Sequence, residues 1–297
     1  MILKPVGPGG AIALIAPSSP FDAGLYEKGR AILEEAGYRT VPGNSIFEVE
    51  GYLAGSDLQR ARDLTDALLD PDIAALICIR GGYGSGRLLP WLPFSTLRKT
   101  PKIFLGHSDI TFLHLAFLSQ MGWVTLHGPN LGGMAELPER VENVLRVLSG
   151  TNEFAWRLEP EQVLRHGKAT GPVIGGNLTC LAHLIGTPYL PDLTGALLLV
   201  EDCGEALYRL DRILCHLKLA GILQRLGGIL LGEFEKCAEN GKICQMVMDH
   251  VRFFDFPVVH ELPFGHGRRN EVIPLGAPFL LDTHGSILRI LDPPIGA

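Results

Sequence analysis

The first half of this chain alternates short apolar runs with segments of helical periodicity. Residues 11–16 and 74–79 are apolar runs of strand length, and residues 25–36 and 58–69 carry apolar side chains at helical spacing. This alternation is typical of a parallel β-sheet with helices on its faces, and it predicts an α/β fold. The next predicted elements are a strand at 103–105, a helix at 109–121, a strand at 124–126 and a helix at 141–148.

A length of 297 residues is sufficient for two domains with separate cores. The alternation stops at a polar stretch, so we predict an N-terminal domain of residues 1–150, a linker of residues 151–168 and a C-terminal domain of residues 169–297. The second half is less regular and is expected to form a mixed α/β domain with antiparallel pairing near its end. Its predicted elements are a Gly-rich turn at 175–177, strands at 196–200 and 228–231, and a helix at 207–219.

Composition excludes several functional classes. The chain is 46% hydrophobic and 20% charged, which indicates an ordered globular protein. A net charge of -6 and 7% aromatic residues argue against a nucleic-acid-binding surface. The longest apolar runs fall far short of the roughly 20 residues of a membrane-spanning helix. Six cysteines without a C-x-x-C pair, and an N-terminal apolar run too short for a signal peptide, predict a cytoplasmic protein.

Ser108 lies where the strand at 103–105 is expected to turn into the helix at 109–121. Such a position exposes the hydroxyl, and an oxyanion formed beside it would meet backbone N–H groups and the positive end of a helix. The alternative is that Ser108 or Asp109 caps the helix. Because Ile110 stands at the second glycine of G-x-S-x-G, the turn is expected to differ from that of α/β-hydrolases.

A glycine-rich segment follows the predicted strand at 74–79 and reads Arg80-Gly81-Gly82-Tyr83-Gly84-Ser85-Gly86. Ligand sites of parallel sheets gather at the carboxyl ends of the strands, and glycine lets backbone amides approach a ligand closely. The spacing does not match G-x-G-x-x-G, and the chain contains no G-x-x-x-x-G-K-[ST], which disfavours nucleotide binding. Two interpretations of this segment remain open: a tight turn, or a loop whose backbone N–H groups donate hydrogen bonds beside Ser108.

Glu201 ends the apolar run at 196–200. A carboxylate in that position either reaches solvent or finds a partner, and in a catalytic triad it would orient a histidine. The alternative is an edge carboxylate which, with Asp202 and Glu205, favours the start of the helix at 207–219.

His266 stands between Gly265 and Gly267 in an irregular segment, which favours an exposed, functional histidine over a packed one. Metal binding is the competing function. His260-Glu261 begins the zinc motif H-E-x-x-H, but Phe264 occupies the second histidine position, and the other histidines form no apparent ligand cluster. We therefore expect no metal and no cofactor.

In this order and at these distances, the segments resemble those of the LD-carboxypeptidase family of serine peptidases, peptidase family S66. The resemblance covers nearly the whole chain. It extends over Leu14-Ile15-Ala16-Pro17-Ser18, Tyr52-Leu53-Ala54-Gly55, Arg80-Gly81-Gly82-Tyr83-Gly84, Gly106-His107-Ser108-Asp109-Ile110-Thr111, His127-Gly128-Pro129, Gly175-Gly176-Asn177-Leu178, Leu199-Val200-Glu201-Asp202 and Gly265-His266-Gly267.

The resemblance implies a catalytic triad of Ser108, Glu201 and His266. It also implies an oxyanion hole formed by the backbone N–H groups of Gly82 and Asp109, with Gly81 as an alternative to Gly82. The implied architecture is a flavodoxin-like N-terminal domain and a second, smaller mixed α/β domain with the active site between them, in a homodimer. Both domains would contribute to catalysis, the first with the serine and the second with the glutamate and histidine.

The implied reaction is hydrolysis of the amide bond between an L-configured centre and a C-terminal D-amino acid, such as release of D-alanine from a murein tetrapeptide in cytoplasmic cell-wall recycling. The implied partner is thus a small peptide, with no nucleic acid or membrane involved. Arg80 or backbone amides near Ser18 are candidates to bind the terminal carboxylate.

Two alternatives accompany this interpretation. A sister branch of the family hydrolyses microcin C-type peptide-nucleotides with the same triad, although the loop at 80–84 favours the muropeptide branch. A non-catalytic peptide-binding module is disfavoured because all three triad residues are present. His107 stands where family members often have Tyr or Phe, and it is expected to add a second titratable group beside Ser108.

Overall fold

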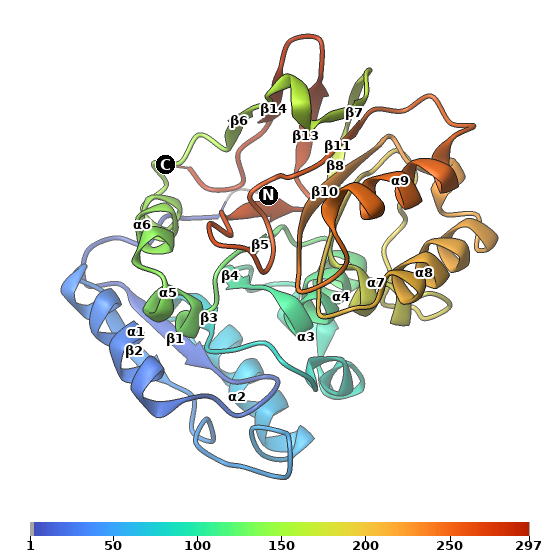
Figure 1. The fold of residues 1–297 in the computed structure, drawn as a ribbon. Helices are drawn as coiled ribbons and strands as arrows, with labels where there is room; N and C mark the ends of the chain where they lie inside the picture. The colour runs from blue at the N-terminus through green and yellow to red at the C-terminus, as the bar shows by residue number, and fades with distance from the viewer. Residues whose placement is uncertain (1–2, 297) are drawn as a thin grey trace.

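The first sheet of the computed structural model, which describes residues 3–296, has six strands in the order β12-β5-β4-β3-β1-β2 (Figure 1). The strands are β1 (Ala11–Ile15), β2 (Arg39–Pro42), β3 (Ile73–Cys78), β4 (Ile103–Gly106), β5 (Thr125–His127) and β12 (Ile273–Leu275). Strands β1 to β5 are parallel and β12 is antiparallel to β5. The order 2-1-3-4-5 is that of flavodoxin-like folds and confirms the predicted α/β class.

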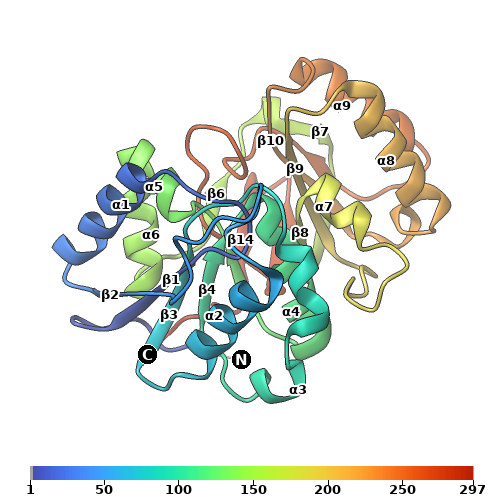
Figure 2. The same cartoon turned by 90° about the horizontal axis from the view of Figure 1, so that it is seen from below.

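Helices cover both faces of this sheet, with α1, α5 and α6 on one side and α2 and α4 on the other (Figure 2). The helices of this half are α1 (Ala23–Glu35), α2 (Asp57–Leu69), α3 (Phe94–Leu97), α4 (Thr111–Met121), α5 (Leu131–Glu136) and α6 (Val141–Leu148), with 3₁₀ turns η1 (Ser85–Trp91), η2 (Ser108–Ile110) and η3 (Pro138–Arg140). Ser56 and Gln59 form a capping box that fixes the start of α2. Strand β2 was not predicted because this short edge strand has no apolar run.

The second sheet has eight strands in the order β6-β14-β13-β8-β9-β10-β11-β7. They are β6 (Ala155–Arg157), β7 (Val163–Arg165), β8 (Lys168–Asn177), β9 (Leu197–Cys203), β10 (Gly228–Glu235), β11 (Val258–Val259), β13 (Pro278–Asp282) and β14 (Ile287–Ile290). Strands β8 to β11 are parallel, while β13, β14, β6 and β7 pair antiparallel with their neighbours. The prediction of a mixed α/β half with antiparallel pairing near the end of the chain is confirmed.

The helices of the second half lie together beside this sheet (Figure 2). They are α7 (Leu178–His183), α8 (Leu207–Leu219) and α9 (Asn240–Val251), with 3₁₀ turns η4 (Pro160–Gln162) and η5 (Leu223–Arg225). None of the helices in the described residues is long and apolar enough to span a membrane.

Helix α4 lies between the two sheets, and this position explains why its sequence is largely apolar. Its buried residues point in all directions, and Leu113 and Phe117 belong to the same apolar cluster as Ile174 of β8 and Leu178 of α7. A helix that is apolar on every side is buried rather than amphipathic. The core is therefore continuous between the two halves of the chain, and the segment after Ser108 is held rigidly.

The Gly-rich turn predicted at 175–177 is wrong, because these residues are the last three of strand β8. A Cβ at Gly175 would lie 1.7 Å from the Leu199 carbonyl oxygen, and one at Gly176 would lie 2.6 Å from the Thr111 hydroxyl oxygen. The glycines thus allow close backbone approach to β9 and α4 rather than a turn. Asn177 N–H then donates to Thr111 Oγ1 at 2.9 Å, which joins the second sheet to the helix that follows Ser108.

The segment expected as a linker, residues 151–168, contains strands β6 and β7, which pair with β14 and β11. Conversely, β12 belongs to the second half of the chain but pairs with β5 at the edge of the first sheet. Strands of three residues carry too little apolar periodicity to be recognised in a sequence. The division of the chain into domains stays a prediction.

Candidate active site

Ser108 occupies a strained turn between a strand and a helix. Strand β4 ends at Gly106, and Ser108 begins η2 with a φ of 66°, a left-handed conformation that costs energy for a residue with a side chain. Neither η2 nor α4 has a side-chain cap, and the Asp109 carboxylate instead accepts hydrogen bonds from Ser18 Oγ at 2.6 Å and Ser85 N–H at 2.7 Å. The capping interpretation is therefore wrong.

Two residues from the second half of the chain meet Ser108. His266 Nε2 lies 3.0 Å from Ser108 Oγ, and His266 Nδ1 lies 2.5 Å from Glu201 Oε2. Glu201 belongs to β9 and is completely buried, while His266 lies in the loop between β11 and β12. The structure thus brings together the three residues that the sequence singled out. A serine, an imidazole and a carboxylate connected in this way can activate the hydroxyl as a nucleophile.

The loop that carries His266 is held from both sides. Gly265 N–H donates to Asn270 Oδ1 at 3.1 Å. Arg140, in η3, donates from Nη2 to the Gly267 carbonyl at 2.6 Å and from Nε to the Arg268 carbonyl at 2.9 Å. The imidazole is therefore oriented by its own loop as well as by Glu201.

Replacing Gly265 by alanine should separate this orientation from fold stability. A Cβ at Gly265 would lie 2.6 Å from Glu201 Oε2, and its φ of 104° is unfavourable for other residues. We expect Gly265→Ala to displace the carboxylate and to lower kcat by roughly 100-fold, since small misplacements of catalytic groups have effects of this size. Steady-state kinetics with a thermal melt of each variant tests this.

The matched control is Gly37→Ala, because Gly37 has a φ of 89° and no atom within 4 Å of a built Cβ. Both variants should lose stability of about 1–2 kcal/mol from the left-handed backbone. Only Gly265→Ala should lose activity, and equal kcat values for the two would contradict a positioning role for this close contact.

The buried Glu201 and His266 shift each other's pKa. Burial by itself raises the pKa of Glu201, but the charge of His266 and its hydrogen bond outweigh it and hold this pKa well below its ordinary value. Burial by itself lowers the pKa of His266, but the charge of Glu201 and their hydrogen bond raise it above the ordinary value of 6.5. The pair therefore stabilises the imidazolium that would form when His266 accepts a proton.

Two further histidines surround this pair. His107 is buried, its ring centroid lies 5.0 Å from that of His266, and burial together with the charges of His266 and His127 holds its pKa well below 6.5. His107 is therefore a neutral group near pH 7 and adds no charge beside Ser108. His127 Nε2 lies 4.0 Å from Glu201 Oε1, and these two atoms have no hydrogen-bond partner among residues 3–296.

The glycine loop lies directly against the serine. A Cβ at Gly81 would be 2.8 Å from Ser108 Cβ, and Tyr83 N–H donates to Ser19 Oγ at 3.1 Å, which fixes the far end of the turn. Gly82 has a φ of 107°, which few residues other than glycine adopt. The backbone of this loop can therefore approach the carbonyl group of a substrate attacked by Ser108.

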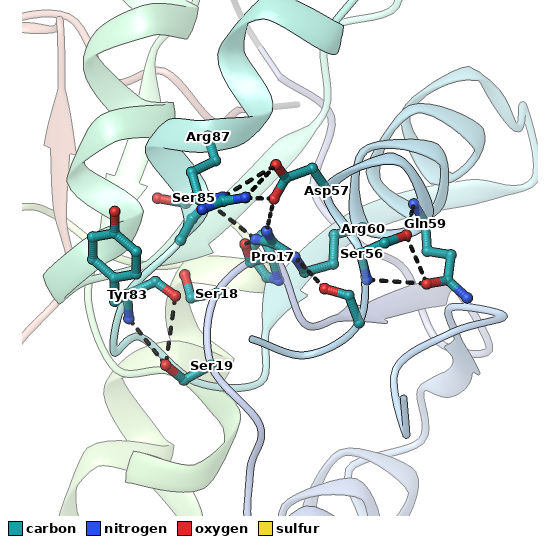
Figure 3. A network of polar contacts seen from close by, with 12 residues as sticks. Pro17, Ser18, Ser19, Ser56, Asp57, Gln59, Arg60, Tyr83, Ser85 and Arg87 are labelled. Atoms are coloured by element: carbon teal, nitrogen blue, oxygen red, sulfur yellow. Dashed lines mark hydrogen bonds and ion pairs between the residues drawn. The ribbon is translucent and has the colours of Figure 1, made fainter. Parts of the chain in front are cut away.

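A buried arginine organises the loops around this turn, as Figure 3 shows. Arg60 is 2% exposed. Its Nη2 lies 2.5 Å from the Asp57 carboxylate, which also pairs with Arg87 at 2.8 Å. Its guanidinium donates to three loop carbonyls, those of Pro17, Gly55 and Gly84. One cation thus joins the glycine loop to the loops that follow β1 and precede α2.

Two cavities adjoin Ser108. The larger has a volume of about 610 Å³ and the smaller about 360 Å³, and Gly82, Ser108 and His266 line both. The larger is also lined by Phe112, Asn177, Thr179 and Tyr189. The smaller is also lined by Arg80, Asn130 and Arg140. Residues 3–296 contain no group of three or more His, Cys, Asp or Glu side chains arranged as metal ligands.

The sequence did not single out Arg140, His127 or Arg60. His127 occurs in one of the family-like segments, His127-Gly128-Pro129, and this was the available signal. Arg60 lies in the amphipathic helix α2 and Arg140 in the 3₁₀ turn η3, where an arginine is ordinarily exposed, and only the tertiary structure shows that both are buried.

Comparison with known proteins shows to which family the chain belongs. The family model for the LD-carboxypeptidase N-terminal domain matches residues 12–128, and that for the C-terminal domain matches residues 170–281. A probable murein peptide carboxypeptidase of Bacillus subtilis is 35% identical over 290 residues, covering 94% of this chain and 91% of its own length.

Two solved structures are similar to the whole chain. The muramoyltetrapeptide carboxypeptidase of Oxalobacter formigenes is 30% identical with a TM-score of 0.85, covering 96% of this chain and 99% of its own. The microcin C7 self-immunity protein MccF has a TM-score of 0.90 at 23% identity, covering both chains completely, and this likeness shows the shared fold. The chain belongs to the LD-carboxypeptidase family, peptidase family S66, and is a serine-type carboxypeptidase.

Proposed function

We propose that this enzyme hydrolyses the amide bond between an L-configured centre and a C-terminal D-amino acid, with Ser108, His266 and Glu201 as its catalytic triad. The observation that carries the proposal is the continuous contact from Ser108 Oγ to His266 at 3.0 Å and from His266 to Glu201 at 2.5 Å, between two cavities. In this arrangement a scissile bond can lie across Ser108 with one part of the substrate in each cavity.

Each residue has a defined role in the proposed mechanism. His266 Nε2 accepts the proton of Ser108 as its oxygen attacks the amide carbonyl, and Glu201 keeps the proton of Nδ1 in place and stabilises the imidazolium. His266 then transfers the proton to the leaving amine, which departs as the acyl-enzyme forms. Water attacks the acyl-enzyme with His266 again as the base, which releases the acid and regenerates Ser108.

The oxyanion of the tetrahedral intermediate needs hydrogen-bond donors. We assign this role to the backbone N–H groups of Gly82 and Asp109, with Gly81 as the alternative in the glycine loop. The assignment is supported by the close contact of this loop with Ser108 and by the hydrogen bond from Ser85 N–H to Asp109, which ties the two donor segments together. Such preorganised donors usually provide a large part of the rate acceleration.

The proposed substrate is a murein tetrapeptide from which D-alanine is released in cytoplasmic cell-wall recycling. This proposal is supported by the similarity to proteins named murein peptide carboxypeptidase and muramoyltetrapeptide carboxypeptidase. A cytoplasmic location and a homodimer stay predictions.

The experiment that tests the function is an assay of free D-alanine from a murein tetrapeptide, with an otherwise identical peptide that ends in L-alanine as the control. Release from the D-terminated peptide alone supports the proposed specificity. Equal release from both would contradict it, and release from neither would direct the search to other peptide amides.

The alternative substrate class is a microcin C-type peptide-nucleotide. It is supported by the size of the larger cavity, about 610 Å³, by the aromatic side chains of Phe112 and Tyr189 in its walls, and by the fold shared with MccF. Parallel assays with a peptidyl-adenylate analogue and with the tetrapeptide distinguish the classes by their kcat/KM values.

The pH dependence of kcat/KM should follow His266. Below its pKa the imidazole is already protonated and cannot accept the proton of Ser108, so activity should rise with pH up to that pKa. Because the Glu201 charge raises this pKa, we expect an acid limb of unit slope with its midpoint above 6.5.

Because burial and the charges of His266 and His127 hold the pKa of His107 well below 6.5, His107 should add no second inflection near the midpoint set by His266. A pH–rate profile measured in overlapping buffers at constant ionic strength tests both statements. A slope of two, or a midpoint below 6.5, would contradict them.

A further inference from the structure

The smaller cavity beside Ser108 contains a buried cation, Arg140, that forms no ion pair with any carboxylate of residues 3–296, although Glu136 also lines the cavity. Arg140 is 7% exposed and lines this cavity together with Ser108 and His266. Its neighbour Glu139 pairs instead with Arg268 at 2.5 Å. Burial lowers the pKa of Arg140, and the charges of Glu136, Glu139 and Glu233 oppose this shift without cancelling it. A buried charge of this kind is costly unless something compensates it.

The guanidinium of Arg140 has unused hydrogen-bonding capacity. Nε donates to the Arg268 carbonyl, Nη1 to the Gly133 carbonyl at 3.2 Å and Nη2 to the Gly267 carbonyl at 2.6 Å. A guanidinium carries five N–H donors, so one on Nη1 and one on Nη2 are left over. Two N–H groups on one planar cation match the two oxygens of a carboxylate.

A second donor lies in the same cavity. Asn130 is 4% exposed, and its Oδ1 accepts from His107 N–H at 3.2 Å, which orients the side chain. The amide NH₂ of Asn130 has no acceptor among residues 3–296, while the residue itself lines the cavity. At the rim, Arg80 is exposed and donates to the Pro20 carbonyl at 2.7 Å. The donors of this cavity are thus the N–H groups of Arg140, Asn130 and Arg80, and the acidic residues Asp22 and Glu136 line it as well.

We propose that the smaller cavity is a carboxylate-binding subsite, in which the two free N–H groups of Arg140 and the amide of Asn130 bind a carboxylate of the substrate. The proposal rests on the function proposed above and deepens it. The carboxylate has two possible sources, the terminus of the leaving D-amino acid or a free carboxylate on the acyl portion of the peptide. The volume of about 360 Å³ accommodates either one.

Binding of a carboxylate here would also affect the catalytic base. The charge of Arg140 lowers the pKa of His266. A bound carboxylate offsets that charge, so the subsite would make His266 more basic when the correct substrate is in place. Arg140 also holds the His266 loop through the Gly267 carbonyl. Recognition of the substrate and orientation of the base thus depend on the same side chain.

The test compares one tetrapeptide with two derivatives, one amidated at its C-terminus and one amidated at the free carboxylates of the acyl portion. For the wild-type enzyme we expect kcat/KM to fall by roughly 10- to 100-fold for one derivative, the loss expected of a charged hydrogen-bonded contact. The derivative that is affected identifies the source of the carboxylate.

The variant Asn130→Asp tests whether the loss of kcat/KM on amidation arises in the smaller cavity. Aspartate keeps an oxygen to accept from His107 N–H but places a negative charge beside Arg140. We expect the KM of the unmodified peptide to rise at least tenfold with kcat little changed, and the preference for the free carboxylate to disappear. Arg157→Gln, at an exposed arginine that pairs with Glu159 outside the site, is the matched control and should keep the wild-type preference.

The outcomes are distinct. If the wild-type enzyme hydrolyses all three peptides equally, or if Asn130→Asp lowers all three rates by the same factor, the subsite is wrong and the proposed function stands. If the wild-type enzyme hydrolyses none of them, the proposed function is wrong and the subsite falls with it.

Discussion

Ser108→Ala is expected to lower kcat for D-alanine release by about 10⁴- to 10⁶-fold, because loss of a serine nucleophile leaves only the contributions of the oxyanion hole and of substrate binding. KM should change little, because the hydroxyl oxygen of Ser108 acts in bond formation rather than in binding of the intact substrate. Steady-state kinetics and active-site titration with an acylating reagent test this prediction.

The fold should tolerate this substitution. Alanine removes one oxygen and keeps the φ of 66°, so the melting temperature of Ser108→Ala should match that of the wild type. Ser108→Gly should be inactive as well but more stable, because glycine adopts a left-handed conformation without the cost of about 1–2 kcal/mol. Ser149→Ala, at an exposed serine after α6, is the control for purification and assay. Retention of more than about 1% of wild-type kcat by Ser108→Ala would contradict the nucleophile assignment.

Glu201→Gln is expected to lower kcat by roughly 10⁴-fold, the size of effect seen when a triad carboxylate becomes an amide. The buried amide can present its NH₂ group to His266 Nδ1, which would leave the proton on Nε2 and remove the base that Ser108 needs. A glutamine is nearly the same size, so the effect should be on catalysis rather than on packing.

The same substitution should change the pH dependence in a defined direction. Glu201 raises the pKa of His266, while burial and the Arg140 charge lower it. Without the carboxylate the pKa should fall, so the acid limb of the residual activity should move to lower pH. Glu239→Gln, at an exposed glutamate that pairs with Lys242, is the charge-matched control. An unchanged acid limb would mean that Glu201 does not set the basicity of His266.

The secondary structure near the catalytic residues could be predicted from local patterns. Helices α2 and α6 and strands β3 and β9 occur within a few residues of their predicted positions, because each has its own apolar periodicity or apolar run. Ser108 and Glu201 could be singled out because each follows an apolar run with a chemically capable side chain, and His266 because it stands between two glycines in an irregular segment. That they belong together came from the order and spacing of segments that resemble one family.

What the sequence did not reveal depends on contacts between distant segments. Gly175 and Gly176 were interpreted as a turn, but they are in a strand because β9 and α4 approach too closely for a side chain. The burial of Arg140 and its bonds to the His266 loop join residues more than a hundred positions apart, and no local pattern reports such a contact.

The sequence by itself determined the alternation of strands and helices and the identity of the reactive groups, because both follow from side chains close together along the chain. Only the tertiary structure decided that Ser108 Oγ and His266 Nε2 lie 3.0 Å apart, that Glu201 is buried beside His127, and that Arg140 faces a small cavity. These features depend on how two sheets pack around α4, and packing is a property of the whole chain rather than of any one segment.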